Sequence, residues 1–317
     1  MKFRPLGEIV MTFTAFLAVA VLAGSMPVDS SVLADLPSHF MGQYAVGAGL
    51  LLAAACFAKT PKALLALLVL LLGVSLFQIA PLLPFGADMP TGKTLKILQA
   101  NVLFINKDAT RFEKLIAVEK PDLIVTQETP PAFAKMFASL KKEYPYQNLH
   151  PDGKTPRGLA VLSKLPFEKM AMTSFDHPNV PAQQFTIRLA KQGITFLSIH
   201  PFTPTENITR RDNEFSLIAG RFSKNQPENF VLLGDFNATP YCQAYKKLVA
   251  ALKLRNAREG HGILPTWPTF LPTPLLRIPI DHMLVSKNIA VADFRTGPAF
   301  GSDHLPVIAE ISLRGTL

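Results

Sequence analysis

Three apolar stretches in the first 83 residues constrain the fold of this chain more than any other feature. They cover residues 9–26, 40–58 and 63–83. Each is close in length to the roughly 20 apolar residues that a helix needs to cross a bilayer. A cleaved signal peptide explains the first stretch alone, and a buried soluble hairpin fits poorly with the uniformly apolar third stretch. The sequence therefore predicts about three transmembrane helices within an N-terminal membrane domain over 1–84.

The orientation of these helices is predicted from the basic residues beside them. Lys2 and Arg4 precede the first stretch. Lys59 and Lys62 lie between the second and third stretches, whereas 27–39 contains no lysine or arginine. Basic residues next to membrane spans favour the cytoplasmic side. We therefore expect an integral protein of the inner or plasma membrane, with the following domain on the periplasmic or extracellular side.

The net charge belongs to the part of the chain after residue 90. The chain has 32 basic and 23 acidic residues, and four of each kind fall in the first 90 positions, so the remainder carries the whole charge of +9. A basic domain fits nucleic acid, anionic lipid or a phosphorylated small molecule, although a basic excess can also only maintain solubility. The two cysteines, Cys56 and Cys242, argue against a disulfide framework or a cysteine zinc site and leave the compartment open.

The second domain is expected over 95–317, after a proline- and glycine-rich linker at 85–94. Strands are predicted from alternation and β-branched residues at 95–102, 123–128, 159–162, 185–189, 194–199, 230–233, 280–285 and 307–313. Helices are predicted at 111–119, 210–222 and 241–252. Because many short strands are separated by few helices, we expect two packed β-sheets with helices on their outer faces.

Polar residues with metal-binding and acid–base chemistry recur at the ends of the predicted strands. They are Asn101, Glu128, His200, Asp235 and Asp281, together with Asn237, Asp303 and His304 in adjacent loops. Carboxylate oxygens suit hard cations such as Mg²⁺ or Mn²⁺. Hydrolysis of a phosphate ester needs a positioned water, a group that takes its proton, and positive charge or donors around the phosphoryl oxygens. These residues supply all three, so the sequence indicates a hydrolase of phosphate esters.

Seven short motifs resemble, in their order, those of the endonuclease/exonuclease/phosphatase superfamily. They are Asn101-Val102, Gln127-Glu128, Gly158–Ser163, Ser198–His200, Gly234–Asn237, Ile280–His282 and Gly301–Pro306. The resemblance runs from about Leu95 to Leu313. It implies a four-layered α/β sandwich of two mixed sheets flanked by helices, and a divalent-metal-dependent phosphoesterase that drives water onto phosphodiester or phosphomonoester bonds.

The resemblance also implies a metal-binding role for three residues. Glu128 would be the main ligand of Mg²⁺ or Mn²⁺, with Asn101 beside it, and Asp303 would complete the metal and hydrogen-bond network. Leu103 departs from the pattern, since some members carry a polar residue two positions after the asparagine. The number of metal ions therefore stays open.

Five residues match positions with catalytic roles in the superfamily. Asp235 would orient or deprotonate the attacking water, and Asn237 would hold a phosphoryl oxygen. His304, oriented by Asp281, would neutralise charge on the phosphoryl group or assist as a base. His200 would donate to the leaving oxygen or the phosphate, as in the deoxyribonuclease and phosphatase branches.

Two arginines and one loop are candidates for substrate contacts. Arg157 and Arg277 could bind substrate phosphate, although a solvated loop arginine is the alternative for Arg157. The segment 264–279, rich in proline and apolar residues, could form an apolar collar or simply pack on the domain. For Trp267 within it, packing against the loop is the favoured interpretation.

The substrate is expected to be a phosphate ester, with nucleic acid favoured because the domain is basic. A lipid or sphingomyelin-type phosphodiesterase is the alternative that explains a membrane anchor, and an inositol-phosphate-type phosphatase also fits the superfamily. A non-catalytic binding protein would have lost at least one central residue, and all are present. No protein partner is indicated. A channel or transporter is disfavoured because the apolar stretches contain no intramembrane charge.

Overall fold

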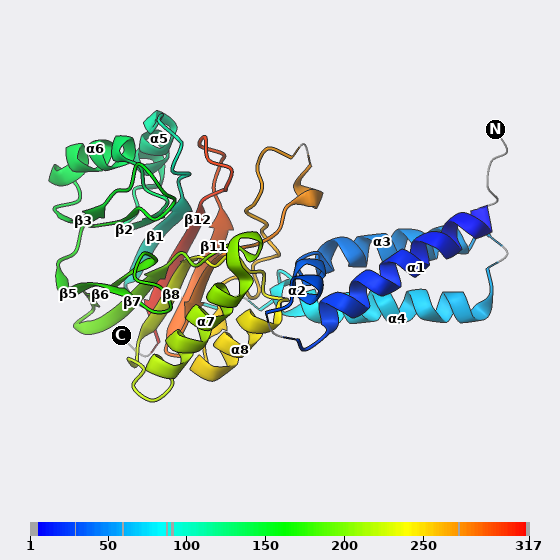
Figure 1. The fold of residues 1–317 in the computed structure, drawn as a ribbon. Helices are drawn as coiled ribbons and strands as arrows, with labels where there is room; N and C mark the ends of the chain where they lie inside the picture. The colour runs from blue at the N-terminus through cyan, green and yellow to red at the C-terminus, as the bar shows by residue number, and fades with distance from the viewer. Residues whose placement is uncertain are drawn as a thin grey trace.

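The computed structural model describes residues 6–28, 30–58, 60–86, 88–89, 92–271 and 273–314. An N-terminal helical bundle projects from an α/β body (Figure 1). The bundle contains α1 (Leu6–Ser25), α2 (Val32–Ser38), α3 (Met41–Ala55) and α4 (Lys62–Ile79). Figure 1 shows α1, α3 and α4 side by side, with the short α2 at the junction with the body. The chain thus passes along the bundle three times before it enters the body.

Two segments of the bundle are long and apolar enough to cross a membrane, Leu6–Ser25 and Lys62–Leu82. Only 17% and 22% of their apolar windows are buried, unlike the core helices of a soluble protein. The stretch predicted over 40–58 forms a helix of only 15 residues, Met41–Ala55. At 1.5 Å per residue it spans about 22 Å, less than the roughly 30 Å of a hydrocarbon core. Three transmembrane helices are therefore not confirmed.

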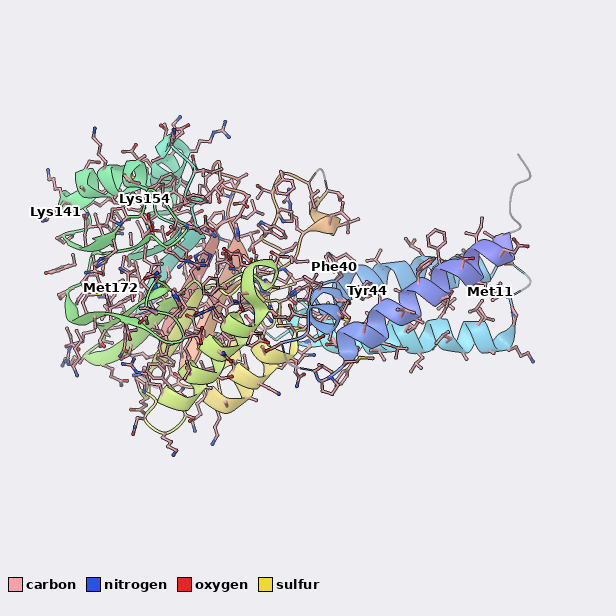
Figure 2. The ribbon with its side chains drawn as sticks, in the orientation of Figure 1. Met11, Phe40, Tyr44, Lys141, Lys154 and Met172 are labelled. Carbon is pink, nitrogen blue, oxygen red and sulfur yellow. The ribbon has the colours of Figure 1, made fainter. Side chains whose placement is uncertain are left out.

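The surface of the bundle is apolar along most of its length. Phe16 is 71% exposed and Phe77 82% exposed. Figure 2 shows mainly carbon on the side chains of the bundle, including Met11, whereas charged side chains such as Lys141 and Lys154 surround the body. An exposed apolar surface of this kind marks a region that binds lipid or another apolar partner.

Of the four basic residues that predict the orientation, the structure describes Lys62. Lys2, Arg4 and Lys59 lie outside the described residues, as do parts of the predicted linker. Lys62 begins α4 at the end of the bundle that is remote from the body (Figure 1). It thus lies at the end of the bundle that the sequence predicts to be cytoplasmic.

The body contains two mixed six-stranded sheets, as the sequence predicts. The first has the order β11-β12-β1-β2-β4-β3 and the second β5-β6-β7-β8-β10-β9. The strands of the first sheet are β1 (Thr94–Asn101), β2 (Leu123–Gln127), β3 (Tyr146–His150), β4 (Leu159–Ser163), β11 (Ile289–Thr296) and β12 (Val307–Leu313). Those of the second are β5 (Phe167–Ser174), β6 (Pro181–Leu189), β7 (Gln192–Ile199), β8 (Phe230–Asp235), β9 (Arg255–Asn256) and β10 (Asp281–Val285). The pairs β1–β2 and β7–β8 are parallel.

Helices cover the outer faces of both sheets and complete an α/β sandwich. In Figure 1, α5 (Thr110–Glu119) and α6 (Pro131–Ser139) lie on the first sheet, and α7 (Pro204–Phe222) and α8 (Gln243–Leu252) on the second. The central core lies between the sheets and includes Val125, Phe185 and Phe196, none of which is exposed. Separate apolar clusters join each sheet to its helices. The layers hold the strands rigidly, so the strand ends form a firm base for a site.

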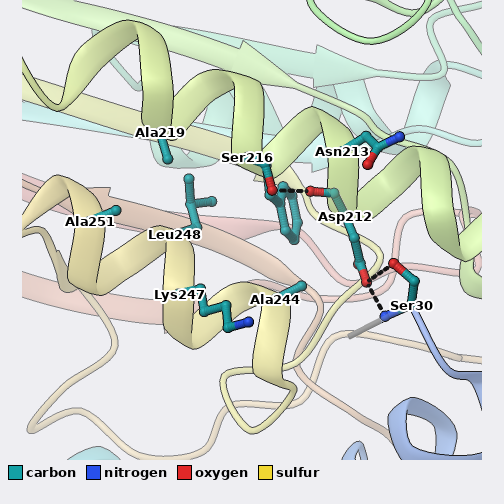
Figure 3. Close-up of a pocket in the computed structure, with 10 residues that line it drawn as sticks. Ser30, Asp212, Asn213, Ser216, Ala219, Ala244, Lys247, Leu248 and Ala251 are labelled. Carbon is teal, nitrogen blue, oxygen red and sulfur yellow. Dashed lines mark hydrogen bonds between the residues drawn. The ribbon is translucent and has the colours of Figure 1, made fainter. Parts of the chain in front are cut away.

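The bundle is attached to the body by specific contacts. Pro81 and Leu82 accept hydrogen bonds from the backbone of Gly260 and Gly262. Asp88, in the predicted linker, forms ion pairs with two arginines of the body, Arg255 and Arg314. Figure 3 shows a further contact, in which Ser30 meets Asp212 beside a cavity of about 360 Å³ between α7 and α8. Among the described residues of the junction, Ser30, Pro81, Leu82 and Asp88 therefore bind directly to the body.

Candidate active site

The two parallel strand pairs direct their last residues to one edge of the sandwich. Asn101 ends β1 and Glu128 directly follows β2 in the first sheet. Asp235 ends β8 and His200 directly follows β7 in the second. The antiparallel β10 begins at the same edge, where Asp281 pairs with Asp235. The structure thus brings residues from both sheets into one cluster, as the sequence predicts from their positions at strand ends.

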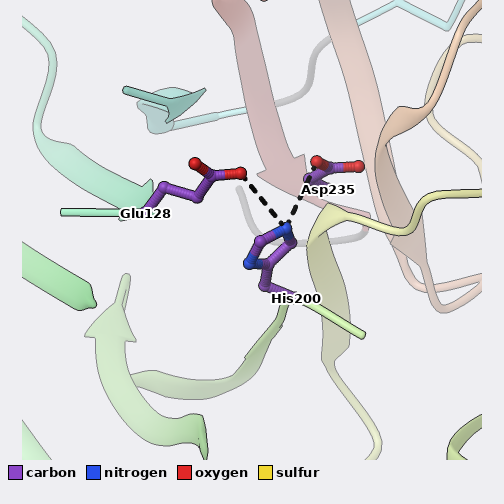
Figure 4. A group of neighbouring side chains, drawn as sticks. All are labelled: Glu128, His200 and Asp235. Atoms are coloured by element: carbon purple, nitrogen blue, oxygen red, sulfur yellow. Dashed lines mark ion pairs between the residues drawn. The ribbon is translucent and has the colours of Figure 1, made fainter. Parts of the chain in front are cut away.

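The first part of the cluster is the group of Glu128, His200 and Asp235 (Figure 4). The Nε2 atom of His200 lies 3.7 Å from Glu128 Oε1 and 3.5 Å from Asp235 Oδ2. The Nδ1 atom of His200 donates to the carbonyl of Pro156 at 3.0 Å, so Nε2 faces the carboxylates. One ligand atom from each residue lies within 4.8 Å of the others.

The second part of the cluster shares Asp235 and adds Asp281 and His304. The Nδ1 atom of His304 donates to Asp281 Oδ2 at 2.8 Å, and its Nε2 atom lies 3.7 Å from Asp235 Oδ2. Asp281 is fully buried, and its other oxygen accepts a hydrogen bond from Gln99 at 3.1 Å. The His304 ring is therefore held with Nε2 toward Asp235.

Charges within the cluster shift the pKa values of its buried groups. Burial alone would lower the pKa of His304, but the charges of Asp281 and Asp235 raise it to about 10. Burial likewise opposes a charged His200, but a hydrogen bond and the charge of Asp235 raise its pKa. The pKa of Asp235 is lowered against its own burial, chiefly by His304 and His200. An ionised Asp235 thus lies between two imidazole rings whose raised pKa values favour the protonated form.

Asn101 joins the cluster through its amide nitrogen. Its Nδ2 donates to Glu128 Oε1 at 2.8 Å and to Asp235 Oδ2 at 3.0 Å. Its Oδ1 accepts the backbone N–H of Leu103 at 3.0 Å and so faces away from the carboxylates. In this arrangement Asn101 orients Glu128 and Asp235, whereas the sequence predicts a metal-ligating role for it.

A divalent cation fits the donors that the structure brings together. Glu128 and Asp235 offer carboxylate oxygens within 4.8 Å of each other and of the imidazole nitrogen of His200. Hard cations prefer such oxygens, and the Nε2–H of His200 faces them as a donor and not as a ligand. Glu128 is partly open to solvent, with its side chain 14% exposed. The described residues can therefore hold a divalent cation next to the buried imidazoles, and nothing in this donor set selects Mg²⁺ over Mn²⁺.

Asp303 lies at the border of the cluster and outside both of these groups. Its Oδ2 accepts a hydrogen bond from the indole Nε1 of Trp267 at 3.1 Å. The Trp267 ring centroid is also 6.5 Å from that of His304. Trp267 therefore orients Asp303 as well as packing in its loop, and the structure does not place Asp303 among the potential ligand atoms.

Asn237 lies two residues beyond Asp235, in the loop that follows β8. Its backbone N–H donates to Asp235 Oδ1 at 2.9 Å, which helps to fix that carboxylate. Its side-chain amide donates to the carbonyl of Pro201 at 3.1 Å and is 8% exposed. The structure therefore brings Asn237 next to the cluster. One hydrogen of its side-chain amide is already bonded to Pro201.

The two predicted substrate arginines lie in different places. Arg157 donates to the carbonyl of His200 at 3.1 Å and stacks over Phe202 at 4.5 Å. It lines a cavity of about 920 Å³ directly beside the cluster. Arg277 contacts the carbonyl of Thr269 at 3.4 Å and faces a cavity against α3. Arg157 is thus next to the cluster, whereas the described contacts of Arg277 do not reach it.

The backbone at the strand ends adopts conformations that side chains rarely take. Leu103, Glu128 and Asn237 have φ values of 64°, 54° and 49° and follow the ends of β1, β2 and β8. Gly234 has a φ of 140°, and a Cβ there would lie 2.1 Å from the carbonyl oxygen of Ile199. Backbone strain of this kind is concentrated at functional sites. It turns Glu128 and Asn237 toward the cluster.

The sequence does not predict a chain of buried polar side chains that lies between the sheets next to the cluster. Gln99 donates to Gln127 Oε1 at 2.7 Å and to Asp281, and Gln127 donates to Ser198 at 3.1 Å. These side chains are fully buried between the sheets. The signal was present, because Gln99 precedes Asn101 by two positions and so lies on the same face of its strand.

Glu214 on α7 is a buried carboxyl beside this site that the cluster does not use. It is 1% exposed, and neither oxygen accepts a hydrogen bond within the described part of the chain. Burial raises its pKa to about 8. Because the folded state retains this proton above the usual range of a glutamate, folding stability falls as pH rises through roughly 4.5 to 8.

We expect Glu214→Gln to remove this loss of stability. The variant should melt at a higher temperature than the wild type at pH 8 and at nearly the same temperature at pH 5. Each pKa unit corresponds to about 1.4 kcal/mol, so the gain at pH 8 is on the order of a few kcal/mol. The measurement is thermal unfolding at both pH values, with the exposed Glu113→Gln as control. An equal effect at both pH values would show that Glu214 does not titrate in this range.

The fold and the site together place this chain among the two-sheet α/β sandwiches with acidic and imidazole groups at one sheet edge. The chain belongs to the Endonuclease/Exonuclease/phosphatase family, whose model matches residues 98–304. Members of this family are hydrolases of phosphoester bonds. The chain has no match among curated proteins. The resemblance seen in its motifs is thereby confirmed.

Solved structures of the family share the fold of the body. A truncated TDP2 of Caenorhabditis elegans gives a TM-score of 0.58 at 18% identity, covering 70% of this chain and 99% of that one. TDP2 of D. rerio with a single-strand DNA product gives 0.57 at 15% identity, covering 70% and 100%. Sphingomyelinase C from Streptomyces griseocarneus gives 0.51 at 18% identity, covering 69% and 99%. At these identities the similarity establishes the fold alone.

Proposed function

We propose that this chain is a membrane-anchored, divalent-metal-dependent phosphodiesterase. The observation that carries the proposal is the convergence of Glu128, His200, Asp235, Asp281 and His304 at one sheet edge, within the distances given above. Family membership supports a phosphoester substrate. A bound Mg²⁺ or Mn²⁺ would act as a Lewis acid on the phosphoryl oxygens.

The side chains of the cluster have separate roles in the proposed reaction. Before the reaction Asp235 is ionised and accepts a hydrogen bond from the attacking water, and this bond orients the water toward phosphorus. As the bond from the water oxygen to phosphorus forms, Asp235 takes the proton of the water. His304 and His200 present Nε2–H groups on either side of Asp235. His304 stabilises the charge that develops on the phosphoryl oxygens, and His200 gives its Nε2 proton to the leaving oxygen as the bond from that oxygen to phosphorus breaks. Asp281 holds the His304 ring. Glu128 would hold the cation, and Asn101 orients Glu128.

Nucleic acid is the substrate that we favour. The body carries the net positive charge of the chain, which attracts a polyanion. The cavity of about 920 Å³ beside the cluster is lined in part by Arg157, by Phe202 and by two histidines, His150 and His177. Aromatic and cationic groups of this kind suit stacked bases and backbone phosphates. The D. rerio TDP2 structure, with the same fold, contains a single-strand DNA product.

A phospholipid is the second candidate substrate, because an apolar cavity joins the body to the bundle. It measures about 500 Å³ and is lined by Val46 and Leu50 of α3 and by Leu275 and Leu276 of the predicted collar. Leu275 is 65% exposed. Such a cavity suits an acyl chain. The sphingomyelinase C similarity supports this candidate at the level of the fold.

The placement in a membrane is part of the proposal. We assign 1–84 to a membrane domain, 85–94 to a linker that Asp88 joins to the body, and 95–317 to the catalytic domain. The passes of α1 and α4 cross the bilayer, and the shorter α3 crosses with its body-proximal end near the interface. The catalytic domain then lies on the periplasmic or extracellular side, in agreement with Lys62 at the remote end of the bundle.

The test is hydrolysis by the full-length protein in nanodiscs. Single-stranded and plasmid DNA, RNA, sphingomyelin, phospholipids, inositol phosphates and bis-p-nitrophenyl phosphate would be assayed with Mg²⁺, with Mn²⁺ and with EDTA. We expect metal-dependent cleavage, fastest with a nucleic acid. Fastest cleavage of a lipid would select the second candidate, and fastest release of inorganic phosphate from inositol phosphates would select a phosphomonoesterase. No turnover by folded, metal-loaded protein would support a non-catalytic binding protein.

A further inference from the structure

A buried ion network connects the membrane side of the chain to α7. Arg211 of α7 is fully buried and donates from its two terminal nitrogens to both oxygens of Asp35 in α2, at 2.9 and 2.7 Å. Its Nε donates to Asp212 Oδ1 at 2.9 Å. Asp212 in turn accepts from the backbone and hydroxyl of Ser30, at 2.9 and 3.1 Å (Figure 3). A paired and fully bonded buried guanidinium of this kind fixes the geometry of its neighbours.

His39 extends the network from the bundle to the loop after β8. Its Nε2 donates to Asp35 Oδ2 at 3.1 Å. Its Nδ1 accepts the backbone N–H of Thr239 at 3.3 Å and lies 3.0 Å from the Thr239 hydroxyl. His39 is 4% exposed and Thr239 is fully buried. The ring therefore bridges the bundle and the body without access to bulk water.

The same network also reaches Asn237, inside the loop of the cluster. Arg211 donates to the carbonyl of Asn237 at 3.2 Å while it holds Asp35. Asn237 donates its backbone N–H to Asp235, the central carboxylate of the proposed site. Asn237 has a φ of 49°, in the left-handed region that asparagine adopts more readily than most residues with side chains. The loop from Asp235 to Thr239 is thus held at two points. Arg211, which pairs with Asp35 of α2, binds the carbonyl of Asn237, and His39, the residue after α2, binds the N–H of Thr239.

We propose that Asp35 and His39, which lie between the apolar helices α1 and α3, are positioning residues of the active site. They hold the Asp235–Thr239 loop through Arg211 and through the amide of Thr239. The bundle then acts as a structural part of the catalytic centre in addition to anchoring it. This proposal rests on the proposed function, since the loop carries the proposed water-orienting carboxylate.

Two features distinguish this role from simple tethering. One other contact between bundle and body, Lys246 Nζ with Gln78 Oε1 at 2.7 Å, ends on α8 and does not touch the loop. His39 contacts Thr239, four residues from Asp235. Asp35 holds Arg211, which donates to the carbonyl of Asn237, two residues from Asp235. A misplacement of about 1 Å at a reacting group can cost about 100-fold in rate. Loss of the contacts of Asp35 and His39 should therefore lower turnover far more than loss of the contact between Gln78 and Lys246.

The experiment compares His39→Ala with His39→Gln in the full-length protein in nanodiscs. Glutamine offers one donor for Asp35 and one acceptor for Thr239, and alanine offers neither. We expect His39→Ala to lower kcat by about 10- to 100-fold with KM within about twofold, and His39→Gln to restore most of kcat. Gln78→Ala is the matched control for a contact between bundle and body, and it should retain the wild-type kcat.

Hydrogen exchange of the peptide that contains Thr239 provides a readout independent of substrate. We expect faster exchange of the 235–241 region in His39→Ala, but not in His39→Gln or Gln78→Ala. Asp35→Asn, which keeps the size of the side chain, should give the same pattern if the alanine variant does not fold. Wild-type exchange in His39→Ala or Asp35→Asn, or an unchanged kcat, would overturn the proposal. If the wild type hydrolyses nothing, the proposed function fails, and the exchange result still decides whether α2 holds the loop.

Discussion

Replacing Asp235 with asparagine is expected to lower kcat by roughly 1000-fold, the middle of the range for loss of a positioned acid–base group. Asp235 is 1% exposed and is the carboxylate shared by both halves of the cluster. Asparagine keeps the size of the side chain but removes the charge that orients the water and pairs with His304 and His200. The measurement is steady-state hydrolysis of the substrate that the nanodisc panel selects.

The control for this variant is Asp108→Asn, which removes an exposed carboxylate from the loop before α5. Its kcat should equal that of the wild type within about twofold, because surface substitutions away from special features have small effects. Thermal unfolding would confirm that Asp235→Asn is folded. Near-wild-type turnover by a folded Asp235→Asn protein would remove Asp235 from the reaction.

Replacing Glu128 with glutamine is expected to raise the metal concentration needed for half-maximal activity by roughly 100-fold. Changes to groups that only support a metal ligand already cost about 10- to 100-fold in affinity, and Glu128 is the most accessible carboxylate of the cluster. Glutamine retains an oxygen but loses the negative charge. Mn²⁺ binding can be measured directly, because the electron paramagnetic resonance signal of free Mn²⁺ is lost when the ion binds. This measurement gives the metal affinity without the use of a substrate.

At saturating metal, Glu128→Gln should recover a part of the wild-type kcat, whereas Asp235→Asn should not recover. This difference separates a residue that holds the cation from one that acts on the water. Glu113→Gln, on an exposed helix face, should leave Mn²⁺ affinity unchanged. Equal Mn²⁺ affinity of Glu128→Gln and wild type would place the cation elsewhere.

The sheets could be predicted where strands are buried on both faces. Strands such as β2, β4 and β8 are fully buried and therefore appear as short apolar runs. The sequence does not predict β3, β5, β9 or β11. β5 is largely exposed at the edge of its sheet, so its side chains show no clear alternation. Hydrogen bonds to neighbouring strands define such an edge strand, and no pattern in its own sequence reveals it.

The chemistry of the site was visible in the sequence, but its geometry was not. Strand ends and motifs indicate which residues meet, and Asp281 beside His304 is found as the resemblance implies. The orientation of the Asn101 amide and the bond from Trp267 to Asp303 depend on contacts between segments far apart in the chain. Local spacing carries no information about such contacts.

The bundle shows the same limit of local information. The apolar run over 40–58 predicts a full span, but the helix ends at Ala55 and begins only at Met41. The short α2 was missed because seven residues that include Pro37 give little helical signal. Its position is fixed by Asp35 and the following His39, whose partners lie 176 and 200 positions away in the chain.

Hydrolysis in H₂¹⁸O tests most directly whether this chain drives water onto phosphorus at the Asp235 cluster. Full-length wild-type protein and Asp235→Asn would be incubated in nanodiscs with Mn²⁺ and the preferred substrate of the panel. We predict one ¹⁸O atom on the phosphoryl product of the wild type, none without metal, and product formation reduced roughly 1000-fold in Asp235→Asn. Label in the leaving alcohol, or equal product from both proteins, would contradict a phosphoesterase centred on Asp235.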